Sequence, residues 1–247
     1  MTSALDRGVL PEQALSCAAV DPWGAEVVRD HGRRVAAGAQ VGSHLDALAS
    51  GSAGSGSGAF AALAAASGAA LVTAVARRTM RHLPDSDQTA IRMIEIADEA
   101  DAARPALLAA SDRDAEVQQQ LAAAVALPQD TDEQRTARLV ELRSLLEESV
   151  DGQLELARRS VRLADLAEEA TAASDPNAAA DGLSAVAALH AAAVAALANV
   201  ELNAFAIVDP DRRDELTATC RALRDRATQM LDDARAAFDG RIRLTVP

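Results

Sequence analysis

The sequence lacks several residue types that common classes of protein depend on. It contains no Lys and no Tyr, and its aromatic residues are Trp23, Phe60, Phe205 and Phe238. So few aromatic side chains leave no platform on which nucleic-acid bases could stack. The 24 basic residues are all Arg and face 37 acidic residues, which gives a formal charge of −13. This acidic balance argues against nucleic acid as a partner.

Cysteine and strand-forming residues are also scarce. Cys17 and Cys220 form neither a disulfide framework nor a metal-binding spacing, and the four histidines form no paired motif, so we expect no metal. The N-terminus lacks the pattern of a signal peptide, which predicts a cytoplasmic protein. Ala, Leu, Glu, Arg and Gln dominate where a β-sandwich or barrel would need Val, Ile, Tyr, Phe and Thr. The composition therefore predicts an all-α fold.

Much of the 49% hydrophobic content is Ala, concentrated in two nearly uncharged stretches at 58–76 and 178–207. The first is long enough to raise the question of a transmembrane helix. However, its residues are mostly Ala, Gly, Ser and Thr, and small residues let neighbouring helices approach closely. We therefore expect two central helices of a bundle and no membrane partner.

Charged amphipathic helices are expected around these two. Capping residues, prolines and apolar spacing predict helices over 43–50, 85–110, 111–126 and 131–172, with a bend or break at Gly152, and a last helix that opens at Asp209-Pro210. No solenoid period repeats along the chain. The sequence thus predicts a bundle of six or seven mostly antiparallel helices over 41–243, preceded by an N-terminal extension at 1–40.

Polar residues inside the Ala-rich helices are the candidates for chemistry. Asn199 and Asn203 are four residues apart and share one helix face, whereas Asp181 lies about five turns earlier. The structural alternative is that both Asn side chains bond neighbouring backbone and that Asp181 caps its helix. The Gly-rich stretch 51–60 reads either as a linker or as a loop that presents backbone N–H groups at a helix N-terminus. It is not a P-loop, because no Gly-Lys-Ser/Thr follows.

Three blocks of the sequence resemble the cyclodeaminase/cyclohydrolase family, which includes the cyclodeaminase domain of formiminotransferase-cyclodeaminase and bacterial methenyltetrahydrofolate cyclohydrolases. The first is HLDALAS with GSGAFAALAAASGAALVTAVARRT, within residues 44–79. The second is LPQDTDEQRTAR, residues 127–138, and the third is DPNAAADGLSAVAALHAAAVAALANVELN, residues 175–203. The blocks occur in the family's order and at similar separations, over roughly residues 43–240.

The resemblance implies an enzyme that acts on a C–N one-carbon bridge of tetrahydrofolate, either opening a methenyl bridge with water or cyclising a formimino group with loss of ammonia. It implies Asp181 as the acid/base carboxylate and Asp114, in SDRDAEV, as a second one. It also implies a homodimer that binds a small-molecule substrate and requires no cofactor, with a tetrahydrofolate derivative as the possible substrate. The implied substrate-binding residues are Gly56, Ser57, Gly58, Gln129, Arg135, Arg138, Asn199 and Asn203.

Two other functions remain open at this stage. The family's Lys after Leu-Pro is Gln129 here, and the proline and serine around its glycines are missing. These departures suit a related enzyme that catalyses an imine or iminium cyclisation on a non-folate substrate in specialised metabolism. The other alternative is a helical interaction module without catalysis. The retained Asp and Asn residues argue against it, because a buried polar group left unpaired costs about 1–3 kcal/mol.

Overall fold

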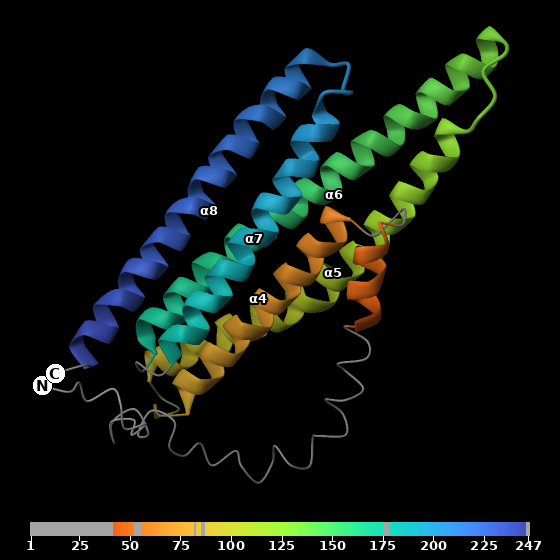
Figure 1. Ribbon diagram of the computed structural model, residues 1–247. Coiled ribbons are helices and arrows are strands. Elements are labelled where there is room, and N and C mark those ends of the chain that lie inside the picture. Colours follow the sequence, from red (N-terminus) through yellow and green to blue (C-terminus); the bar gives the residue numbers. More distant parts are fainter. Residues whose placement is uncertain (1–41, 52–55, 82, 85–86, 175–177, 246–247) are drawn as a thin grey trace, which may run out of the picture. The chain divides into compact units, whose positions relative to one another are not determined.

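The computed structural model describes residues 42–51, 56–81, 83–84, 87–174 and 178–245. Residues 42–50 form a short helix. The chain divides into two compact units, and the unit that begins at Ser50 contains the helical bundle. The expected extension at 1–40 lies outside the described residues. The bundle is built from α4 (Ser57–Met80), α5 (Gln88–Val125), α6 (Asp132–Ala173), α7 (Ala179–Ala204) and α8 (Pro210–Thr245) (Figure 1).

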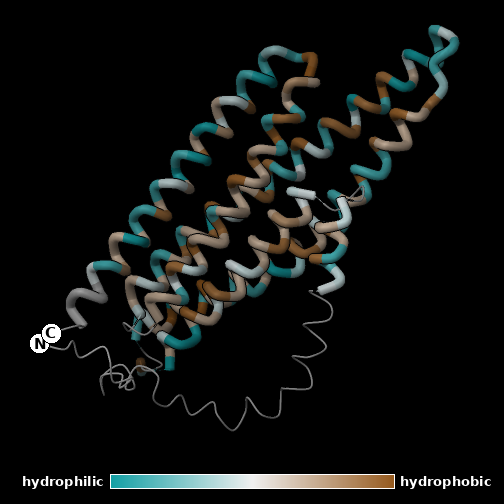
Figure 2. Tube along the Cα trace, viewed as in Figure 1, coloured by the Kyte–Doolittle hydropathy of each residue, from teal (hydrophilic) through white to brown (hydrophobic). Residues whose placement is uncertain are grey.

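The all-α prediction is confirmed, and the described residues contain no strand. Short connections join consecutive helices, which makes them antiparallel neighbours. α4 packs against α5, α6 and α7, and α7 packs against α4, α6 and α8. Figure 2 shows apolar residues gathered on α4 and α7, while α8 carries many hydrophilic residues. The two Ala-rich helices are thus central, as the sequence predicts.

Close approach between helices replaces bulky side chains in this core. The buried positions of α4 are mostly Ala and Gly, as are those of α7. A Cβ atom added to Gly68 of α4 would lie 2.5 Å from Cγ of Leu189 in α7. Both helices are long and apolar enough to cross a membrane by length and composition alone, with mean hydropathies of 1.9 and 1.8. Their buried faces identify them as core helices of a bundle.

One prediction about an individual helix was wrong, and one of the two alternatives at Gly152 is excluded. The stretch expected to form two helices is the single helix α5, which continues through Pro105. Gly152 does not interrupt α6, which runs unbroken from a capping box formed by Thr131 and Gln134. An exposed proline or glycine inside a long packed helix costs only its local propensity, because tertiary contacts on the other face hold the helix together.

Candidate active site

The N-terminus of α4 meets α7 through a polar contact. α4 begins at Ser57, directly after its extended N-cap residue Gly56, which is the last residue of the Gly-rich stretch before the helix. The Ser57 hydroxyl donates a hydrogen bond to Oδ1 of Asn199 at 2.7 Å. Asn199 therefore fixes the start of α4.

The second Asn of α7 contacts α6 instead. Nδ2 of Asn203 donates to the hydroxyl oxygen of Ser149 at 3.0 Å. Ser149 and Gln153 are both buried and lie four residues apart in α6, so they share a face. One side of α6 therefore inserts two polar side chains into an otherwise apolar packing layer.

Asp114 of α5 completes this cluster. Nε2 of Gln153 donates a hydrogen bond to Oδ1 of Asp114 at 2.7 Å. Burial raises the pKa of the Asp114 carboxyl, and the hydrogen bond from Gln153 opposes this shift only in part. Because desolvation disfavours the charged form, Asp114 holds a proton more readily than an ordinary aspartate. A carboxyl that holds its proton more readily than an ordinary aspartate is suited to act as a proton donor.

Gly58 brings the backbone of α4 against this carboxyl. A Cβ atom built on Gly58 would lie 2.4 Å from Oδ2 of Asp114 and 2.4 Å from Nε2 of Gln153. Any side chain at position 58 would displace the pair. We define the polar cluster as Ser57, Gly58, Asp114, Ser149, Gln153, Asn199 and Asn203; it unites α4, α5, α6 and α7.

A cavity of about 470 Å³ opens beside the cluster, between α5 and α6. Asp114, Ser149 and Gln153 line it, together with apolar residues such as Leu107 and Val117. Its wall also carries charged residues of both signs, namely Arg113, Glu148, Asp151, Glu155 and Arg159. This volume lies in the range of small-molecule sites. Among the described residues, no group of three or more His, Cys, Asp or Glu could hold a metal ion.

Asp181, the other predicted carboxylate, is not part of the polar cluster. It lies in the first turn of α7, whereas Asn199 and Asn203 lie in its last turns, about five helical turns away. Its Oδ2 is 3.2 Å from Nη1 of Arg78, near the C-terminus of α4, and both side chains are 40% exposed. The structure gives Asp181 an ion pair between two helix ends.

Gln129, Arg135 and Arg138 also lie apart from the polar cluster. They belong to the α5–α6 turn and the start of α6, at the tip of the helical hairpin drawn in green in Figure 1. Nη1 of Arg135 donates to the carbonyl oxygen of Gln129 at 2.8 Å, and Nε of Arg138 donates to that of Val125 at 3.2 Å. In this structure, therefore, both guanidinium groups stabilise the turn.

The sequence analysis missed Ser149 and Gln153. A signal for them exists in the spacing of α6, where Leu145, Ser149, Gln153 and Leu156 step by four, four and three residues along one buried face. Two polar residues within an apolar stripe indicate either paired core groups or a site. Their partners come from α5 and α7, which spacing within α6 cannot reveal.

Comparison with known proteins identifies the family. A family model described as formiminotransferase-cyclodeaminase matches residues 40–222. The fold matches the crystal structure of formiminotetrahydrofolate cyclodeaminase from Thermotoga maritima, with a TM-score of 0.61 and 21% sequence identity, over 80% of this chain and 94% of that chain. The search of curated proteins gave no match. The chain belongs to the formiminotransferase-cyclodeaminase family.

Proposed function

We propose that this protein acts on the one-carbon bridge of a tetrahydrofolate, cyclising a formimino group with loss of ammonia, and that Asp114 is its acid. The observation that carries the proposal is the pairing of Asp114 with Gln153 beside Gly58, at the wall of a cavity. Family membership and the name of the Thermotoga maritima protein support the choice of reaction.

The proposed step balances with a single proton donor. The N10 lone pair of the substrate forms a bond to the formimino carbon while the electron pair of the C=N double bond moves to the imine nitrogen. The proton of N10–H passes to that nitrogen, which makes a tetrahedral carbon that carries a neutral –NH2 group. Asp114 then gives its proton to that amine, the C–N bond breaks, and ammonia leaves with the bond's electron pair. The methenyl bridge that remains is a cation, and the carboxylate left on Asp114 stabilises it electrostatically. A raised pKa suits this role, because the carboxyl must be protonated before the step.

Gln153 can form a hydrogen bond with Asp114 both before and after the carboxyl loses its proton. Its Nε2 donates to the Asp114 carboxylate, while its Oε1 is buried and has no hydrogen-bond partner among the described residues. Rotation of the amide by half a turn would let Oε1 accept a hydrogen bond from protonated Asp114. We assign Gln153 the role of a positioning residue that serves both protonation states.

The Ser and Asn residues of the polar cluster hold the elements around Asp114. The Ser57–Asn199 bond fixes the N-terminus of α4, and the Asn203–Ser149 bond fixes α6 one turn from Gln153. Their loss would loosen the geometry of Asp114 without removing the acid. Asp181 has no step in this scheme.

A second candidate rests on the charges at the cavity. Acidic side chains in its wall outnumber the two arginines, Arg113 and Arg159. The acidic glutamyl tail of a folate would meet repulsion there, whereas a cationic imine would be attracted. The alternative substrate is therefore a small iminium compound that cyclises by the same acid-assisted step.

The test compares the two substrate classes. Purified protein is mixed with 5-formiminotetrahydrofolate, and formation of the methenyl product is followed by its absorbance, with ammonia release measured in parallel. We expect both signals to rise together above the buffer control. If neither rises, while a small amino-imine is cyclised, the second candidate replaces the first.

We further propose a cytoplasmic homodimer. Large apolar side chains are exposed at the α5–α6 tip, where Val140 is 61% exposed, and beside the α7–α8 connection, where Phe205 is 84% exposed. A second copy would cover such surface. Sedimentation of the full chain tests this proposal, and a monomer at micromolar concentration would contradict it.

A further inference from the structure

A second cavity lies among α6, α7 and α8, about five helical turns along α7 from the polar cluster. Its volume is about 180 Å³. A cavity of about 150 Å³ is large enough to hold one benzene ring. The space therefore fits a single small ring and a short substituent.

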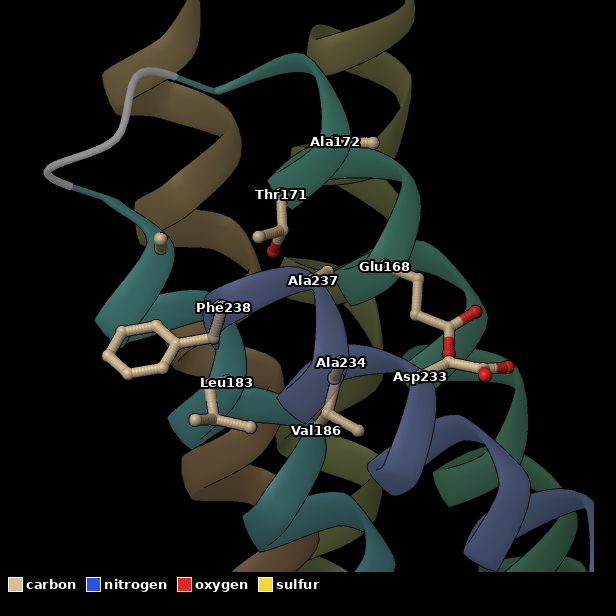
Figure 3. A pocket seen from close by; sticks show the side chains of 11 residues that line it. Glu168, Thr171, Ala172, Leu183, Val186, Asp233, Ala234, Ala237 and Phe238 are labelled. Atoms are coloured by element: carbon tan, nitrogen blue, oxygen red, sulfur yellow. The ribbon is translucent and has the colours of Figure 1, made fainter. Parts of the chain in front are cut away.

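Small and apolar residues make most of its wall. Ala179, Gly182 and Val186 come from α7, and Ala234 and Phe238 come from α8 (Figure 3). Phe238 is one of only four aromatic residues in the sequence. An apolar wall of this kind excludes highly hydrated ions and accepts a hydrocarbon group.

One edge of the same cavity is acidic. Glu168 of α6 and Asp233 of α8 both line it (Figure 3), and the charge of Asp233 acts on Glu168. Oδ1 of Asp233 accepts a hydrogen bond from Nε2 of Gln229 at 2.9 Å. Oε1 of Glu168 is buried and has no hydrogen-bond partner among the described residues. Its other oxygen lies 3.7 Å from Nη2 of Arg226, which also pairs with Asp165. Burial is the main cause of the raised pKa of Glu168; the charge of Arg226 opposes this shift in part, and the nearby Asp165 and Asp233 add to it.

A ligand with a cationic nitrogen would offset the negative charge at this edge of the cavity. An N–H donor at the acidic edge would satisfy Oε1 of Glu168 and offset the repulsion between the two carboxylates. An anion would meet two like charges, and a neutral ring would leave the buried oxygen unpaired. Apolar wall and acidic edge together therefore select one chemical class.

We propose that this cavity is a binding site for a small ring or short hydrocarbon that carries a primary ammonium group, with the ring among Val186, Ala234 and Phe238 and the ammonium at Glu168 and Asp233. The site is separate from the polar cluster and goes beyond the proposed one-carbon reaction.

Titration calorimetry with the full chain tests the proposal, using benzylammonium as the probe. Benzyl alcohol and benzoate serve as neutral and anionic controls of nearly the same shape. We expect benzylammonium to bind and both controls to bind at least about tenfold more weakly, since a hydrogen bond to a charged group contributes about this factor. Absence of benzylammonium binding, or equal binding of benzyl alcohol, would overturn the proposal.

Variants locate the binding. Glu168→Gln keeps the shape of the side chain and removes its charge, so benzylammonium affinity should fall about tenfold. Glu169→Gln is the matched control, because Glu169 neighbours Glu168 on α6 but binds Arg92 and does not line the cavity. Ala234→Leu fills the cavity from α8 and should abolish binding. Equal affinity in the wild type, Glu168→Gln and Ala234→Leu would contradict the assignment, and far-ultraviolet circular dichroism checks that each variant is folded.

Discussion

The raised pKa of Asp114 makes the free energy of unfolding depend on pH. Burial raises its pKa above the ordinary value of 3.8, so the folded protein retains a proton that the unfolded chain has already lost. The stabilising contribution of this group is therefore fully present below pH 3.8 and is lost as the pH rises through the raised pKa. A buried carboxyl in this position therefore lowers the stability of the protein at neutral pH.

Asp114→Asn should therefore stabilise the protein at neutral pH relative to the wild type. The Asn side chain stays neutral at every pH, and its oxygen can still accept from Gln153. Urea unfolding at about pH 4 and about pH 7 should show a larger advantage of the variant at pH 7. The exposed neighbour Asp112 provides the control variant Asp112→Asn. An advantage that is larger at pH 4 would contradict the raised pKa.

Gly58→Ala tests the close approach of α4. The added methyl group would overlap Asp114 and Gln153, so we expect a loss of about 1–3 kcal/mol in the free energy of unfolding. We also expect the Gly58→Ala variant to lose enzymatic activity, because the Asp114 carboxyl is displaced. Gly56→Ala is the control, because nothing lies within 4 Å of a Cβ atom at Gly56. Equal unfolding free energies for the two variants would count against this packing.

At the scale of elements, the sequence predicted helices best where the chain carries local signals. Thr131 caps α6 as expected, and the last helix opens after Asp209. Along α8, Leu216, Cys220, Ala227 and Met230 are buried at the spacing of one helix face. The expected division of α5 between residues 110 and 111 does not occur, and Gly152 does not break α6, because packing against other helices, rather than local preference, decides whether a helix continues there.

The candidate site could be predicted only in part, for the same reason. Asn199, Asn203, Ser57 and Gly58 stand out as polar or glycine residues next to Ala-rich runs, and Asp114 followed from the resemblance. Gln153 is one of many polar residues in α6, and it is recognised as part of the site only because α5 places Asp114 within hydrogen-bond distance of it. Pairing between helices distant in sequence depends on the three-dimensional packing.

Thr131→Ala tests the capping box at the start of α6. The Thr131 hydroxyl accepts a hydrogen bond from the Gln134 backbone N–H, and the Gln134 side chain returns to the backbone N–H of Thr131. Removing the hydroxyl should cost about 1 kcal/mol in unfolding free energy. Thr136→Ala, at an exposed position within the same helix, should cost less, as thermal unfolding would show. A larger loss for Thr136→Ala would contradict the role of the cap.

At the scale of the whole molecule, alanine replaces aromatic residues as the means of filling the core. Ala192 of α7 is fully buried, whereas Ala187 of the same helix is exposed. Ala192→Leu should lower the free energy of unfolding by about 1–3 kcal/mol, because the added methylene groups have no space. Ala187→Leu should be nearly neutral in urea unfolding. A stabilised Ala192→Leu variant would show that the helices are not closely packed.

The scarcity of aromatic residues and the many acidic residues correspond to two parts of the molecule, its closely packed core and its charged surface. The closely spaced Ala-rich helices α4 and α7 contribute the start of α4 and the last turns of α7 to a small polar cluster. The Arg side chains pair with acidic residues on the outer faces, as Arg92 does with Glu169 and Arg162 does with Glu99. Such exposed pairs contribute little individually. The stability of the molecule therefore depends mainly on the close contacts of α4 and α7.

We propose that the carboxyl group of the polar cluster, and not the one at the start of α7, carries the reaction. The most direct measurement compares Asp114→Asn and Asp181→Asn in the formation of the methenyl product from 5-formiminotetrahydrofolate. The proposed role of Asp114 predicts that kcat falls by about 100-fold or more in Asp114→Asn, and that Asp181→Asn stays close to the wild type. Loss of activity in Asp181→Asn together with full activity in Asp114→Asn would contradict it.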